Sequence, residues 1–261
     1  LTLKIRLICD FFQNMIVTAF LPFMALYLTD MVNQHFSGLF LFALVMINFP
    51  ISIISGHIIE RLPKKTLTLS YQLILSLMLV IMAITISEQV YMIILFCIAY
   101  AIFSITIGMQ QPIMDTIIMD AITPEVEQYI YKISYWLTNI AVALGALIGG
   151  LMYGAHKSML FLIAFAIYIM VFIALFIWLP KDLNQVNQSY THHANEQQFS
   201  VGQILKSYKP AFKDTTYLLL IIGFSILTMG ELSVSSYISV RLKQEFDPMI
   251  LFSLHINGVK M

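Results

Sequence analysis

The chain has 261 residues, of which 59% are hydrophobic and only 11% carry a charge. A soluble domain is usually about 45–50% apolar and about a quarter charged, so this composition excludes a soluble fold. The net charge is zero, which leaves no electrostatic case for a nucleic acid partner. The two cysteines each lie inside an apolar run and predict neither a disulfide framework nor a metal site.

Runs of about 20 apolar residues predict membrane-spanning helices. Such runs lie at about 5–29, 36–59, 66–87, 90–114, 133–155, 158–179 and 215–238. We therefore predict an all-α polytopic membrane protein with about seven transmembrane helices. Its parts are a six-helix bundle at 1–179, a polar loop at 180–214 and the start of a second bundle at 215–261.

Lysine and arginine are distributed unevenly between the two sets of connecting segments. If the N-terminus lies inside, the inner segments hold ten of these residues and the outer segments four. The positive-inside rule therefore predicts a cytoplasmic N-terminus and a cytoplasmic loop at 180–214. The chain starts at Leu1 rather than Met and ends without a polar tail, so we expect a truncated chain.

Charge is concentrated between the second and third predicted spans, where residues 55–67 read SGHIIERLPKKTL. A glycine there lets another helix approach closely, and an acid four residues later can interact with the positive end of a neighbouring helix. The stretch resembles a signature of the major facilitator superfamily through Gly56, Glu60, Arg61, Lys64 and Lys65. Pro63 replaces the second glycine of that signature. The resemblance implies a cytoplasmic latch that holds one conformation, and the alternative is a solvated turn that only fixes orientation.

Two further stretches resemble the same superfamily. In the fifth span, small residues four apart form two rows on a helix, which allows close helix packing; the glycines are Gly145, Gly149, Gly150 and Gly154. Residues 109–139 resemble the segment that links helices four and five in the multidrug branch. In that pattern an acid at the position of Asp120 faces the bases of the latch, so we predict a pair with Lys64. A solvated carboxylate is the alternative.

Acids inside a membrane are costly and are rarely kept without a function. Asp10 lies one turn after Arg6 on the same helix face, so it is either a proton-coupling acid or part of an ion pair near the inner mouth. Glu231 lies about 24 Å along a helix that starts near residue 215, in the outer half of the membrane. Desolvation there favours the protonated form, so this carboxyl could exchange protons near neutral pH, unless the helix ends early.

Polar and aromatic side chains could line a substrate cavity between the helices. Gln111 and Asn139 are candidates for polar contacts, and Tyr135 and Trp136 could stack on flat organic cations. For such residues the alternative is ordinary hydrogen bonding or packing between helices.

Taken together, these stretches resemble the twelve-helix bacterial drug:proton antiporters of the major facilitator superfamily. The resemblance implies a secondary transporter of the plasma membrane that exports lipophilic or cationic drugs in exchange for protons. It implies no cofactor and a monomer when full length. Alternatives are transport of a sugar, peptide or other metabolite, or an inactive truncated remnant. An intramembrane metalloenzyme would need clustered ligands inside the membrane, and no such pattern is present in the sequence, so we predict no enzyme and no metal.

Overall fold

The computed structural model describes residues 2–86, 92–153, 157–179, 214–223, 225–227 and 230. Its elements are the helices α1 (Thr2–Met31), α2 (Gln34–Arg61), α3 (Lys64–Thr85), α4 (Ile93–Ala121), α5 (Pro124–Tyr153) and α6 (Lys157–Trp178). By length and composition, α1, α3, α4, α5 and α6 can each cross a membrane, and α2 contributes the apolar run Gln34–Asn48. The predicted all-α polytopic membrane fold is confirmed.

The chain divides into two compact units, 1–188 and 189–261, and helices α1 to α6 belong to the first. In the second unit, a helix begins after Asp214, where the seventh span is predicted to start. The Asp214 Oδ1 atom accepts hydrogen bonds from the backbone N–H groups of Thr216 at 3.0 Å and Tyr217 at 3.2 Å, which caps the helix. Glu231 and most of the predicted loop at 180–214 lie outside the described residues.

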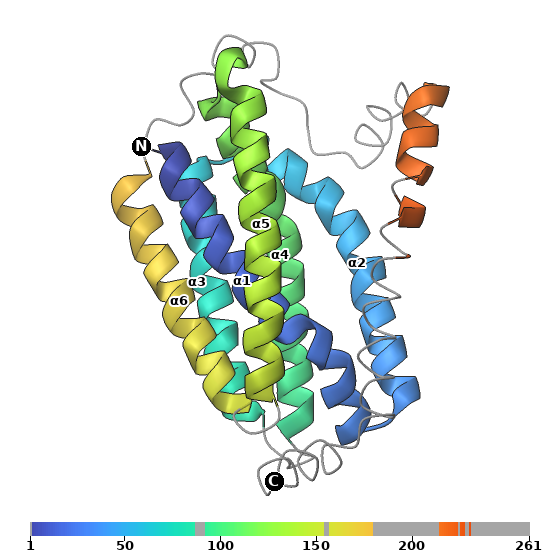
Figure 1. Cartoon of the computed structure of the whole chain (residues 1–261). Coiled ribbons are helices and arrows are strands. Elements are labelled where there is room, and N and C mark those ends of the chain that lie inside the picture. The colour runs from blue at the N-terminus through green and yellow to red at the C-terminus, as the bar shows by residue number, and fades with distance from the viewer. Residues whose placement is uncertain are drawn as a thin grey trace, which may run out of the picture. The chain divides into compact units, whose positions relative to one another are not determined.

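Helix α1 runs through the middle of the first unit and packs against α2, α4, α5 and α6 (Figure 1). Helix α3 packs against α4 and α6, and α2 packs against α4. An aromatic cluster joins α1, α4 and α6, because the ring centroid of Phe20 lies 5.4 Å from that of Phe103 and 5.2 Å from that of Phe161. In a bilayer such close packing, rather than exclusion of water, holds helices together.

Helix α5 approaches α1 closely, and this contact depends on glycine. A Cβ atom added at Gly149 would lie 2.0 Å from the backbone oxygen of Ala19, and one added at Gly145 would lie 2.2 Å from that of Met15. One of the two predicted glycine rows therefore packs against α1. The other row does not: an added Cβ at Gly150 meets nothing within 4 Å. Gly154 lies outside the described residues.

Helices α4 and α5 are longer than their predicted spans of 90–114 and 133–155. Helix α4 continues to Ala121, and α5 begins at Pro124 with Glu125 and Glu127 in its first turn. Proline at the first helical position and acids in the first turn both favour a helix start. The predicted span of α4 ended too early because it was drawn from the run of apolar residues, and a helix can continue beyond such a run. As a result, Asp115 and Asp120 belong to α4.

Candidate functional site

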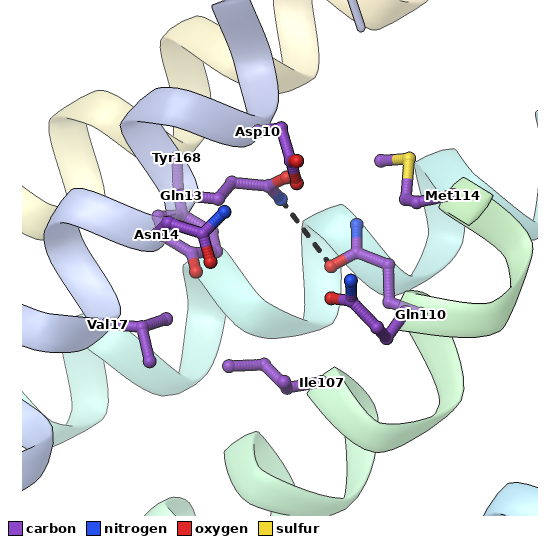
Figure 2. Close-up of a pocket in the computed structure, with 9 residues that line it drawn as sticks. Asp10, Gln13, Asn14, Val17, Ile107, Gln110, Met114 and Tyr168 are labelled. Atoms are coloured by element: carbon purple, nitrogen blue, oxygen red, sulfur yellow. Dashed lines mark hydrogen bonds between the residues drawn. The ribbon is translucent and has the colours of Figure 1, made fainter. Parts of the chain in front are cut away.

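A cavity of about 70 Å³ lies between α1, α4 and α6, with room for several water molecules. Five of its nine lining residues carry a carboxyl or amide group, although it lies inside an apolar bundle (Figure 2). The lining residues are Asp10, Gln13, Asn14, Val17, Ile107, Gln110, Gln111, Met114 and Tyr168. Two of the predicted site residues, Asp10 and Gln111, are among them.

Three glutamines from different helices form one hydrogen-bond network beside the cavity. The Oε1 atom of Gln72, which is fully buried on α3, accepts hydrogen bonds from the side-chain amides of Gln13 and Gln110, both at 2.8 Å. The Gln13 amide also donates to Gln110 Oε1 at 3.5 Å. The Gln72 amide donates to the backbone oxygen of Tyr168 at 3.1 Å. The network provides hydrogen-bond partners for these buried polar groups. It connects α1, α3, α4 and α6 next to the cavity.

The Asp10 carboxylate forms an ion pair with Arg6 one turn earlier on α1. Arg6 Nη1 lies 2.9 Å from Asp10 Oδ1, and the side chains are 1% and 17% exposed, respectively. The Arg6 Nε atom also donates to the backbone oxygen of Met114 on α4 at 3.3 Å. Of the two interpretations of Asp10, the ion pair is therefore present, and the same carboxylate lines the cavity.

The other predicted substrate contacts do not lie around this cavity. On α5, Tyr135 is 71% exposed and Trp136 is 68% exposed, and neither lines the cavity. The side-chain amide of Asn139 donates to the backbone oxygen of Tyr135 at 2.7 Å, within its own helix. A role of these residues in substrate binding stays a prediction.

The predicted contact of the latch is present. The Lys64 ammonium forms an ion pair with Asp120 at the end of α4, where both side chains are largely buried. Lys65 donates to the backbone oxygens of Phe176, at 2.9 Å, and Leu179, so it satisfies carbonyl groups at the end of α6. Gly56 lies on α2 with no atom within 4 Å of an added Cβ. The side chains of Glu60 and Arg61 are outside the described part of the chain.

Sequence reasoning missed Asp115. The predicted fourth span ended at Met114, so this acid was assigned to a connecting loop, whereas it lies on α4. Its side chain is exposed, and it directly follows Met114, whose backbone oxygen accepts the hydrogen bond from Arg6 Nε. The signal that could have identified it is the apolar sequence IIM at 117–119, which continues the helical pattern beyond the acid.

No group of three or more His, Cys, Asp or Glu side chains that could hold a metal ion is found in the described ranges. The charged residue among those that line the cavity is instead Asp10, with Arg6 as its ion-pair partner. This arrangement can change its charge by one when a proton binds.

Two comparisons with known proteins find similarity over most of the chain. The family model described as Major Facilitator Superfamily matches residues 6–258. The chain is also similar to a Na(+), Li(+), K(+)/H(+) antiporter from Planococcus maritimus, with 21% identity over 248 residues. The aligned region covers 94% of this chain and 58% of that antiporter, so the chain spans little more than half of the relative's length.

Proposed function

Because the chain belongs to the major facilitator superfamily, we propose that it is part of a secondary active transporter that exports lipophilic or cationic compounds in exchange for protons. The observation that carries this proposal is Asp10, a carboxylate that lines a cavity inside an apolar bundle. Charged residues within membrane-spanning helices are costly, and such residues usually serve a function. Since a proton and a substrate cation would both compete for this negative charge, binding of one favours release of the other.

The proposed transport cycle alternates access to a cavity between two bundles. Residues 1–179 would form the first bundle, 180–214 the cytoplasmic loop and 215–261 the start of the second, in a plasma membrane with the N-terminus inside. Glu231 would be a further proton-binding acid in the second bundle. The ion pair of Lys64 with Asp120 supports a latch at the cytoplasmic end, because it joins α3 to α4 there. We expect a monomer for the full-length protein.

A second candidate is exchange of monovalent metal cations for protons. The name of the antiporter from Planococcus maritimus favours it. The cavity lining supports it too, because hard cations prefer oxygen ligands and Asp10, Gln13 and Asn14 offer carboxylate and amide oxygens. Transport of an uncharged sugar or peptide has no comparable support, since the relative named above exchanges cations for protons.

The test uses everted membrane vesicles that contain the protein as its own cell makes it. The vesicle interior is acidified by respiration and followed with a fluorescent weak base. Addition of a lipophilic cation should dissipate the pH gradient through the wild type and not through Asp10→Asn. Glu127→Gln, which removes an exposed carboxylate on α5, serves as the control and should behave as wild type. A response to Na⁺ or K⁺ alone would select the second candidate, and no response to any cation would refute both.

A further inference from the structure

The three glutamines beside the cavity have one direction, which a backbone carbonyl on α6 sets. The side-chain amide of Gln72 donates to the backbone oxygen of Tyr168 at 3.1 Å, and a carbonyl oxygen can only accept. With its amide turned by half a rotation, Gln72 would place Oε1 against that oxygen, and a side chain that is 0% exposed cannot replace the lost bond with bulk water. Its Oε1 atom therefore faces the amides of Gln13 and Gln110, from which it accepts hydrogen bonds at 2.8 Å.

Gln72 in turn fixes the direction of Gln13. A glutamine amide carries two N–H donors on its nitrogen and an acceptor oxygen on the other side. The Gln13 nitrogen donates to Gln72 Oε1 at 2.8 Å and to Gln110 Oε1 at 3.5 Å, so both donors are directed at the network. In the described part of the chain, no hydrogen bond ends on Gln13 Oε1. Gln13 lines the cavity, so it offers a ligand an acceptor rather than a donor (Figure 2).

Asp10 offers a second acceptor on the same face of α1. It lies three residues before Gln13, which puts the two side chains close together along the helix, and both line the cavity. The ion pair with Arg6 ends on Asp10 Oδ1, at 2.9 Å, and a carboxylate has about four positions at which it can accept a hydrogen bond. Because Arg6 offsets the charge of Asp10, a ligand must be held here mainly by directed hydrogen bonds. The cavity therefore favours a ligand that carries N–H donors.

We propose that the cavity binds the head group of a protonated primary amine, which donates one N–H group to the Asp10 carboxylate and another to Gln13 Oε1. Hydrogen bonds from a cation to a carboxylate are about twice as strong as those between neutral groups. Apolar side chains that also line the cavity can contact the carbon chain of such a ligand; they are Val17, Ile107 and Met114.

Gln72 does not line the cavity and acts on the ligand through Gln13. It is a positioning residue, because it keeps the oxygen of the Gln13 amide, and not its N–H groups, available to the ligand. A quaternary ammonium carries the same charge as a protonated primary amine but has no N–H group. The site therefore distinguishes these two classes of organic cation. The consequence for transport rests on the proposed function, whereas the binding preference does not.

The test compares two ligands with the same carbon chain and charge, hexylammonium and hexyltrimethylammonium. Their binding to the full-length protein, as its cell makes it, is measured by calorimetry in detergent solution at neutral pH. A hydrogen bond to a charged group changes an affinity by about tenfold or more, so the wild type should bind hexylammonium at least about tenfold more tightly.

Gln13→Met removes the acceptor and Gln72→Met releases the Gln13 amide, so each change should reduce this preference by about tenfold. Ser76→Ala is the matched control. Ser76 lies one turn after Gln72 on α3 and is buried, but its hydroxyl donates to the backbone oxygen of Gln72, at 2.8 Å, and not to its side chain. The preference should therefore remain in Ser76→Ala.

Because Gln72 acts through Gln13, the double variant Gln13→Met with Gln72→Met should lose no more of the preference than Gln13→Met alone. Losses that multiply in the double variant would contradict the positioning role of Gln72. A preference that survives in Gln13→Met would mean that the size of the head group decides, and this result would overturn the proposal. Equal affinities of the wild type for the two ligands would overturn it as well.

A second measurement needs no variant of Gln72. In the wild type labelled with ¹³C-glutamine, hexylammonium should shift the side-chain carbonyl signal of Gln13, which is identified by its absence from Gln13→Met. An unshifted signal would refute the acceptor role of Gln13. Since neither assay needs transport, the predicted preference without cation-driven proton flux would refute the proposed function alone. Cation-driven proton flux with equal binding of the two ligands would leave the proposed function standing and refute this inference.

Discussion

The contact between α1 and α5 should not tolerate a methyl group at Gly149. In Gly149→Ala, the new Cβ would lie 2.0 Å from the Ala19 backbone oxygen and 2.8 Å from an atom of the Phe23 ring. The ring can rotate away, but the carbonyl belongs to a helix backbone. To reach ordinary van der Waals contact at 3.4 Å, α5 must move away from α1 by about 1.4 Å. Overpacking of this kind costs about 1–3 kcal/mol, and we expect the upper end because backbone atoms are involved.

The assay is the free energy of unfolding in detergent, with Gly150→Ala as the matched control. Gly150 is the next residue on the same helix and has open space around its Cβ position, so alanine there should be neutral or stabilise by up to about 1 kcal/mol through its helix propensity. Equal stability of Gly149→Ala and wild type, or equal losses in both variants, would refute the close contact described here.

Three other contacts can be tested in the same way. Lys64→Ala leaves the largely buried Asp120 carboxylate without its partner and should cost about 3 kcal/mol; Lys64→Ala combined with Asp120→Ala should cost less than the sum of the single changes. Lys65→Ala removes the donor to two carbonyls at the end of α6, so amide hydrogen exchange there should be faster, with a loss of about 1 kcal/mol. Gln72→Leu removes the shared acceptor of two amides and should cost about 2–3 kcal/mol, whereas Gln111→Ala at an exposed position should change stability by less than about 0.5 kcal/mol.

The contacts that could be predicted from the sequence are those carried by local spacing or by a family pattern. The pair of Lys64 with Asp120 followed from the family pattern, in which an acid in the segment that links helices four and five faces the bases in the turn between the second and third. The close packing at Gly145 and Gly149 followed from small residues four apart on a helix. Which of the two glycine rows meets α1 did not follow, because it depends on the rotation of α5 about its axis.

The centre of the site was not predictable from a single sequence. Gln72 and its two partners meet because three helices direct these side chains toward one point. The spacing of residues within a single helix does not indicate such a contact between helices. Asp115 was missed for a different reason. A hydropathy window identifies the apolar part of α4 but not the residue at which the helix ends. The burial of Arg6 depends on the position of α4, whose Met114 carbonyl accepts its hydrogen bond.

The most direct test of the central claim measures protons released when substrate binds to the full-length protein as its cell makes it. The purified protein is held in weakly buffered detergent solution with a pH indicator, and a lipophilic cation or Na⁺ is added. If Asp10 exchanges a proton for a cation, the wild type releases protons on binding and Asp10→Asn does not. Proton release of equal size from Asp10→Asn would contradict the account.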